Sequence, residues 1–233
     1  MYEAVHAHRD GAGAATLARH ALTAAELGYE GLVVRNAPAT AQLEAVAARY
    51  DVDIASGVEI RTTERSAAAA AISQHRPQQT LVIVRGHSVA MNRFAVEEPR
   101  VDVLAHPMRG SGDVNHVLAE AAARNGVRVE FDLGPVMQSR GRQRVQAIGR
   151  LQKLHDMITA CDAPYVVTAG VESHLDWRSP RDLAGLAVPL DWSPAWIREG
   201  LAEWGRLVGR NRRRHAESFI QPGVRIDTHE KDD

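Results

Sequence analysis

Four side chains with metal-binding chemistry stand near the ends of short apolar segments: His6, His8, Glu59 and His106. His6 and His8 are two residues apart at the end of an expected strand, so both imidazoles point to the same side of it. Glu59 and His106 also stand at the carboxyl ends of expected strands. In a barrel of parallel strands these ends meet at one mouth, where the four groups are able to converge on a metal ion.

This set resembles the metal-binding motifs of the polymerase-and-histidinol-phosphatase (PHP) superfamily of phosphoesterases. That superfamily uses more ligands, which end in a late Asp-x-His. After its seventh expected strand this chain has Glu172-Ser173-His174 instead. Hydrolysis needs the metal to be held and its water to be activated together. We therefore expect no catalytic residue and no metal site, and the alternative is a metal-dependent phosphoesterase built on the four groups above.

Arginine supplies a second kind of chemistry. Lys153 and Lys231 are the only lysines among the 28 lysine and arginine residues. Planar guanidinium groups bind phosphate through paired hydrogen bonds, although codon bias is an alternative cause of the excess. Three groups are candidate RNA contacts: Arg140, Arg142 and Arg144; Arg178 and Arg181; and Arg210, Arg212, Arg213 and Arg214. The first two groups follow expected strands, at loops where barrel proteins keep binding residues.

Charge distribution and composition indicate where a partner binds and exclude several classes of protein. Residues 138–225 carry 14 basic and 9 acidic side chains, whereas residues 1–137 carry 13 and 16, so an acidic partner is expected at the second half. A hydrophobic content of 45% with a net charge of −1 excludes disorder for most of the chain. No apolar run is long enough to span a membrane, and the single cysteine excludes a disulfide framework. We expect a cytoplasmic protein.

Short β-branched segments alternate with alanine-rich helical segments. Expected strands are 2–6, 31–35, 52–60, 80–85, 102–105, 127–133 and 164–169, with a possible eighth at 187–190. Expected helices include 14–27, 142–160 and 194–217. The pattern predicts an α/β fold, a TIM-like barrel of seven to eight mostly parallel strands, with a doubly wound open sheet as the alternative. We expect one barrel domain over 1–226 and an acidic disordered tail over 227–233.

Three stretches of the second half resemble a known family. They are VEFDLGPVMQSRGRQR (129–144), PYVVTAGVESHLDWRSPRDLAGL (164–186) and FIQPGVRI (219–226). The three stretches, taken in this order along the chain, resemble those of the ribonuclease P protein component 3 family. This family is the archaeal relative of the eukaryotic thirty-kilodalton subunit. The first half matches more loosely, through GLVVRN, SGVEI and DVLAHP. The chain departs from the family pattern at Gly134, where a larger and often basic residue is expected.

The resemblance implies a PHP-related barrel that is a protein subunit of ribonuclease P, the ribonucleoprotein that removes the 5′ leader from precursor tRNA. It implies that the RNA carries the active site, so that any Mg²⁺ requirement belongs to the RNA and this chain has no cofactor. The implied partners are ribonuclease P RNA, ribonuclease P protein component 2, other protein subunits of the particle and precursor tRNA. No membrane partner is implied.

Overall fold

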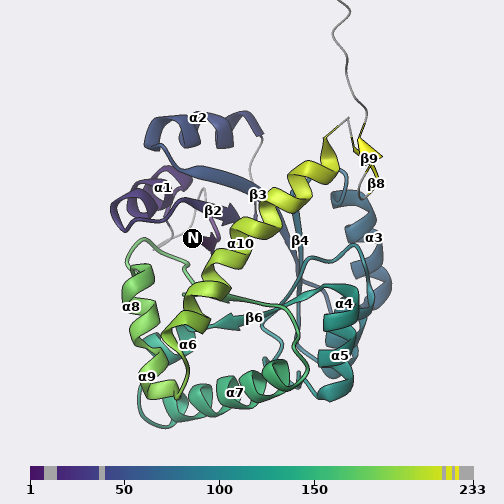
Figure 1. The fold of residues 1–233 in the computed structure, drawn as a ribbon, viewed down its shortest axis with the longest axis vertical. Helices are drawn as coiled ribbons and strands as arrows, with labels where there is room; N and C mark the ends of the chain where they lie inside the picture. The colour runs from purple at the N-terminus through teal and green to yellow at the C-terminus, as the bar shows by residue number, and fades with distance from the viewer. Residues whose placement is uncertain (8–14, 37–39, 217–218, 222–223, 226–233) are drawn as a thin grey trace, which may run out of the picture.

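Seven parallel strands form the central sheet of the computed structural model, which describes residues 1–7, 15–36, 40–216, 219–221 and 224–225 (Figure 1). They are β1 (Tyr2–Val5), β2 (Gly31–Val34), β3 (Asp53–Ile60), β4 (Leu81–Arg85), β5 (Val103–Ala105), β6 (Arg128–Asp132) and β7 (Tyr165–Thr168). The strands lie side by side in chain order. Because the order never reverses, the open-sheet alternative is wrong and the predicted TIM-like barrel is confirmed.

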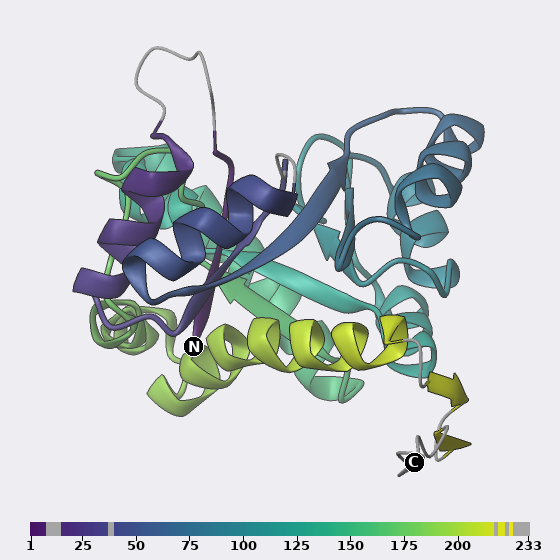
Figure 2. The ribbon, with the colours of Figure 1, turned by 90° about the horizontal axis from the view of Figure 1, so that it is seen from above.

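Helices surround the sheet (Figures 1 and 2). They are α1 (Leu17–Glu26), α2 (Thr40–Tyr50), α3 (Arg65–His75), α4 (Val89–Glu97), α5 (His116–Asn125), α6 (Gly134–Gln138), α7 (Gly141–Ala160), α8 (Pro180–Gly185), α9 (Ala187–Leu190) and α10 (Pro194–His215). Local signals set their ends. The Thr16 and Asn115 side chains cap α1 and α5, and Gly126 ends α5 in the left-handed conformation.

The expected eighth strand at 187–190 is wrong, because these residues form the single helical turn α9. Pro189 has no N–H to donate to a strand ladder, and its fixed φ suits a helical turn. A second difference is α6, which the sequence pattern did not suggest and which has Pro135 in its first turn.

A seam separates β1 from β7, since no backbone ladder joins them in the described part of the chain. The fully buried carboxylate of Glu3 bridges the seam: it accepts hydrogen bonds from Ala169 N at 3.0 Å and from the Thr168 hydroxyl. The indole of Trp204 on α10 also donates to Val167 O, at 2.9 Å. A buried side chain and a helix thus take the place of an eighth strand.

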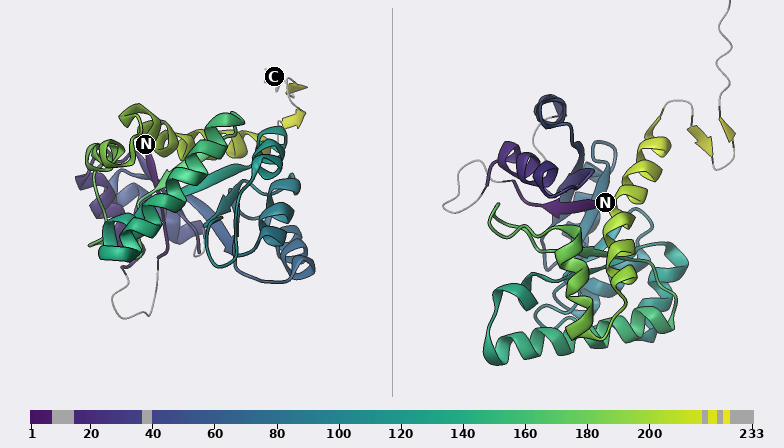
Figure 3. Two further views of the ribbon diagram at one scale, coloured as in Figure 1. Left: turned by 90° about the horizontal axis from the view of Figure 1, so that it is seen from below. Right: turned by 60° about the vertical axis from the view of Figure 1, so that its left-hand side comes forward.

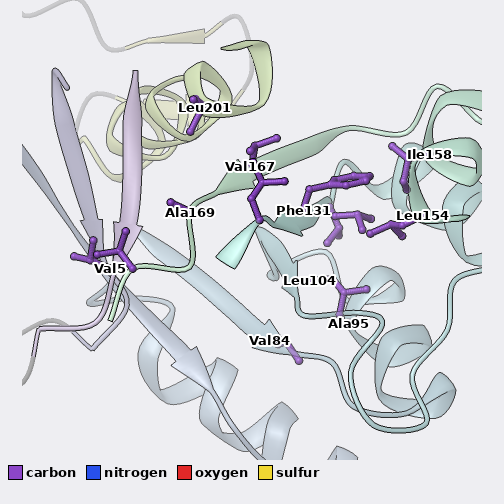
Figure 4. Close-up of a cluster of buried hydrophobic side chains, with 14 of the residues drawn as sticks. Val5, Val84, Ala95, Leu104, Phe131, Leu154, Ile158, Val167, Ala169 and Leu201 are labelled. Atoms are coloured by element: carbon purple, nitrogen blue, oxygen red, sulfur yellow. The ribbon is translucent and has the colours of Figure 1, made fainter. Parts of the chain in front are cut away.

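The hydrophobic core has two parts. The larger lies between the sheet and the outer helices, and Figure 4 shows Phe131 of β6 facing Leu154 of α7 in it. The smaller fills the barrel interior with alternate strand residues such as Val33 and Ile83, against Trp204 of α10. This inside-outside alternation follows from the two-residue period of a strand.

Helix α10 closes the amino-terminal end of the barrel, which we call the base. Asn211 donates to Thr80 O at 2.8 Å, and the Arg212 guanidinium binds the Asp53 carboxylate at 2.7 and 2.9 Å. Asp53 begins β3 and Thr80 directly precedes β4, so α10 crosses the beginnings of these strands. Figure 2 shows α10 along this end. The opposite end, where the carboxyl ends of the strands meet, is the mouth.

The chain continues past α10 into β8 (Phe219–Gln221) and β9 (Val224–Arg225), which pair antiparallel. Figure 3 shows this pair beyond the end of α10, away from the barrel. The expected acidic tail over 227–233 lies outside the described residues. Among the helices that the structure describes, none has the length and apolar character needed to cross a membrane.

Candidate functional site at the mouth of the barrel

The mouth brings together two of the four groups that the phosphoesterase alternative would use. His6, directly after β1, places its Nε2 atom 3.0 Å from Oε2 of Glu59 on β3. His106, after β5, instead places Nδ1 3.2 Å from Oδ2 of Asp132. His8 lies outside the described residues. The structure therefore pairs His6 with Glu59, whereas His106 contacts a different carboxylate, that of Asp132.

Guanidinium groups occupy the space around these carboxylates. Arg35, 3% exposed at the end of β2, binds Oε2 of Glu59 at 3.3 Å and also pairs with the buried Glu130. Arg61 and Arg85 place their Nε atoms 2.9 and 2.7 Å from Oε1 of Glu59. We call this group the mouth network; its members are His6, Arg35, Glu59, Arg61, Arg85 and Glu130.

The charges of the mouth network are mutually stabilising. Burial raises the pKa of Glu59, but the hydrogen bond with His6 and the charge of Arg35 hold that pKa well below its usual range. Burial lowers the pKa of Arg35, but the carboxylates of Glu130 and Glu59 outweigh this and raise it. Burial also lowers the pKa of the His6 imidazole. Glu59 is thus an ionised carboxylate whose charge is met by guanidinium groups.

The mouth network does not fit a metal ion. Both Glu59 oxygens already contact cationic or imidazole nitrogens, and Arg35 places a fixed positive charge among them. No group of three side chains able to hold a metal occurs in the described ranges. The chain does contain one Asp-x-His triplet, Asp227-Thr228-His229, but this triplet lies outside the described residues.

Sequence reasoning missed Arg35 and Arg85, which are central to the network. A signal for them was present, because each arginine ends an otherwise apolar strand segment, GLVVR and TLVIVR. A charged residue at the carboxyl end of a barrel strand points to the mouth. The Arg35–Glu130 pair depends on the barrel closure, because it joins strands that are not neighbours in the sheet.

Glycines allow a close approach beside this network. The backbone N–H of Gly134 donates to Oδ1 of Asp132 at 2.9 Å, and a Cβ at Gly134 would stand 3.0 Å from that oxygen and from Ala169 O. Gly170 has φ +66 and approaches the same carboxylate. A larger residue at 134, which the family pattern suggests, would press on Asp132 in this chain.

A pocket of about 340 Å³ opens next to the mouth network, between the ends of β4, β5 and β6 and helices α6 and α7. Apolar and charged side chains share its lining: Arg85, His106, Pro107, Met108, Arg109, Glu130, Asp132, Gly134, Pro135, Gln138, Ala147, Arg150, Leu151, Leu154, Gly170 and Glu172. Its size is within the range of small-molecule sites.

The first predicted arginine group lies at the start of α7, whose later residues Ala147 and Arg150 line this pocket. Arg140 is the N-cap residue of α7, and Arg142 and Arg144 follow in its first turn. All three are exposed, and none forms an ion pair with a described residue. Positive charge at a helix amino terminus opposes the helix dipole, so helix stability does not explain these residues.

The second group lies after β7. The Arg178 guanidinium donates to Leu175 O at 3.1 Å and to Trp177 O at 2.6 Å, and it forms no ion pair with a described residue. Arg181 is exposed, and Oδ2 of its neighbour Asp182 accepts from the Ser179 hydroxyl at 2.8 Å. Arg181 forms no ion pair with Asp182 or with another described acid.

The third group lies at the base, on α10. Arg210 pairs with Asp102 at 3.0 Å and Arg212 with Asp53 at 2.7 Å, so both hold α10 against the strands. Arg213 and Arg214 are exposed. Because the base is opposite the mouth, the third group does not form one surface with the first two.

The whole described barrel matches the family model "RNase P subunit p30", over residues 1–216. The chain belongs to this RNase P subunit family. It is 52% identical over 230 residues to ribonuclease P protein component 3 of Natronomonas pharaonis, covering 97% of this chain and 95% of the relative. The component 3 protein of Haloarcula marismortui is 49% identical, with 97% of both chains covered. The resemblance seen in the sequence is confirmed, and the chain is a ribonuclease P protein subunit.

Solved structures support the fold of this RNase P subunit. A chain in the cryo-EM structure of archaeal ribonuclease P with mature tRNA matches with a TM-score of 0.83 at 20% identity, covering 100% of both chains. A putative histidinol phosphatase from Listeria monocytogenes matches at 0.52 and 9% identity, over 76% of this chain and 97% of the other. The predicted relation to the PHP barrel is confirmed for the fold alone.

Proposed function

We propose that this RNase P subunit is an RNA-binding protein without catalytic residues or a cofactor of its own. It supports the RNA catalyst, with its Mg²⁺, in removing the 5′ leader from precursor tRNA. Its partners are ribonuclease P RNA, ribonuclease P protein component 2, the other protein subunits and precursor tRNA, and its location is cytoplasmic. Family membership and the name of the relatives support this role.

One observation carries the proposal: the mouth presents exposed arginines, and its buried carboxylates are paired with guanidinium groups. Arg140, Arg142, Arg144, Arg178 and Arg181 form no ion pair with a described residue, and Arg178 donates to two carbonyl oxygens. Exposed arginines without acidic partners attract phosphate. The carboxylates that a hydrolase would use on a metal are engaged by guanidinium groups instead, which disfavours the phosphoesterase alternative.

The salt dependence of binding tests this surface. Replacing Arg140, Arg142 and Arg144 by Gln removes up to three phosphate contacts, and each contact contributes a slope of about 0.7–0.9 in log K against log salt. We expect the slope for ribonuclease P RNA to fall by about 2–3. A matched triple of exposed arginines away from the mouth, Arg49, Arg124 and Arg198 to Gln, changes the net charge equally and leaves the slope unchanged. Equal slopes for both triples would contradict the proposal.

The absence of catalysis by this chain has its own test. We expect the His6→Ala and His8→Ala double variant to stimulate leader cleavage by the RNA as well as the parent protein does. The melting temperature of the variant is measured in parallel, because His6 contacts Glu59. Loss of stimulation with unchanged melting would support the phosphoesterase alternative.

A further inference from the structure

We infer that the mouth pocket between α6, α7 and the ends of β4 to β6 binds one unpaired nucleotide of the RNA. This inference rests on the proposed function, since it takes the mouth as the face that meets RNA. Bases of folded RNA are read by proteins mainly where they are unpaired and turned out of the helix. The pocket volume of about 340 Å³ is large enough for such a base together with its ribose.

One side of the pocket is apolar. Leu151 and Leu154 of α7 are buried beneath it, and Pro107, Pro135 and Ala147 complete this wall. An apolar wall of this kind offers van der Waals contact to the flat face of a base, whichever base it is. A bare inorganic phosphate would leave the wall exposed to water, so the wall argues for a ligand with an aromatic ring.

The other side supplies both donors and acceptors. Arg109 and Arg150 are exposed and make no ion pair within the described ranges, so they are available to a phosphate. Asp132 and Glu172 are carboxylates that also line the pocket. An aliphatic side chain of a protein partner would bury these charges without pairing them, which is costly. A nucleotide pairs them, because its phosphate meets guanidinium and its amino and ribose hydroxyl groups meet carboxylate.

The acceptor is held in place before any ligand arrives. Oδ2 of Asp132 contacts His106 Nδ1 at 3.2 Å, and Oδ1 accepts from Gly134 N at 2.9 Å. His106 itself has φ 49, and its N–H donates to Glu130 at 3.2 Å. A fixed carboxylate accepts hydrogen bonds from base amino groups, as in its pairing with cytosine N4. Guanine, adenine and cytosine carry such a group and uracil does not, so the pocket favours these three bases over uracil.

Titration of the full chain with nucleoside 5′-monophosphates tests the pocket. We expect GMP, AMP and CMP to bind, UMP to bind several-fold more weakly, and inorganic phosphate to bind about tenfold more weakly than GMP, a difference of about 1.4 kcal/mol. The Ala147→Trp variant fills the pocket and is expected to lose GMP binding at least about tenfold. The matched control is Gln146→Trp. Gln146 directly precedes Ala147 on α7, is exposed and does not line the pocket.

A second variant keeps the test valid if Ala147→Trp fails to fold. Arg150 lies on the exposed side of α7. We expect Arg150→Glu to weaken GMP binding at least as strongly as Ala147→Trp does, because it reverses the charge that contacts the phosphate. GMP binding that is unchanged in both variants would overturn the inference. Phosphate binding as tightly as GMP would overturn it too, because the apolar wall would then have no role.

Chemical probing of the assembled RNA separates this inference from the proposed function. We expect Ala147→Trp to leave the salt slope of RNA binding unchanged but to expose one unpaired nucleotide that the parent protein and Gln146→Trp protect. If no nucleotide becomes newly exposed, for example because a protein subunit covers the pocket, the inference is overturned. The RNA-binding role is then unaffected. An unaltered salt slope in the Arg140, Arg142 and Arg144 triple would instead contradict the RNA-binding role.

Discussion

Arg35 is a buried cation whose two carboxylate partners come from strands that are distant in the sequence. It is 3% exposed and joins Glu59 of β3 to Glu130 of β6. Burying such charges is expensive, and the cost is offset only while each charge keeps its partners. The mouth network is thus stable only while all of its charges keep their partners, and no single ion pair accounts for its stability.

Removing this guanidinium is expected to be strongly destabilising. We predict that Arg35→Gln lowers the free energy of unfolding by about 3–5 kcal/mol, because it leaves two buried carboxylates undercompensated. Urea unfolding monitored by circular dichroism measures this. The control is Arg93→Gln, which removes an exposed ion pair with Glu97 within one helix and costs at most about 0.5 kcal/mol. Similar losses in both variants would contradict the prediction.

Glu3 makes the β1–β7 seam sensitive to pH. Burial raises its pKa from 4.5 to about 7, although the hydrogen bonds from Thr168 and Ala169 N work against this. Between these two values the folded protein binds a proton that the unfolded chain does not. The Glu3 contribution to stability is therefore full below about pH 4.5 and is lost as the pH rises through 7, by an amount on the order of 3 kcal/mol.

We predict that Glu3→Gln removes this pH dependence. The Gln amide oxygen accepts from Ala169 N as the Glu3 carboxyl does, and the amide does not titrate. Unfolding free energies measured from pH 4.5 to 8 are expected to agree at the acid end and to favour the variant at pH 8. Parallel pH profiles of the parent and variant proteins would show that Glu3 does not titrate in this range.

At the scale of elements, α10 takes the structural place of an eighth strand. It covers the seam, fills the barrel interior and closes the base, and Trp204 takes part in the first two of these contacts. We predict that Trp204→Ala costs about 3–5 kcal/mol of unfolding free energy, because it leaves a large interior cavity. Val188→Ala, on a side chain that is 78% exposed, is the matched control and changes the value by less than about 0.5 kcal/mol. Chemical denaturation of both variants tests the difference.

The arginines of α10 divide into two roles that neighbouring variants can separate. Arg212 binds Asp53 through two nitrogens, whereas Arg214 makes no ion pair with a described residue. We predict that Arg212→Ala lowers the stability of the free protein by about 1 kcal/mol and that Arg214→Ala leaves it within about 0.5 kcal/mol. Thermal melting of the free protein measures both. If Arg212→Ala melts normally and flattens the salt slope of RNA binding, Arg212 is an RNA contact and the structural role is wrong.

At the scale of the whole molecule, the barrel has two unlike ends. The mouth carries the pocket and unpaired arginines, while α10 seals the base with ion pairs. One body held in this way is expected to unfold as a single cooperative unit. We predict that the amides of Leu201 and Val208 in α10 exchange with solvent at the same slow rate as that of Val33 in β2. Faster exchange in α10 alone, measured by NMR, would show that the base opens independently.

The sequence by itself determined the order of the elements and the family. Apolar segments such as GLVVR and TLVIVR are strands because β-branched runs of that length bury both faces. These signals are local, so a single sequence carries them. The family prediction likewise rested on contiguous stretches, above all Arg-Ser-Pro-Arg-Asp-Leu at 178–183.

Only the tertiary structure decided which side chains meet. Arg35 and Glu130 are 95 residues apart, and their contact exists because the barrel brings the carboxyl ends of its strands to one mouth. The same closure placed Arg212 at the base, where it pairs with Asp53. Composition and spacing specify the elements, whereas pairing between distant residues depends on how the elements close in space.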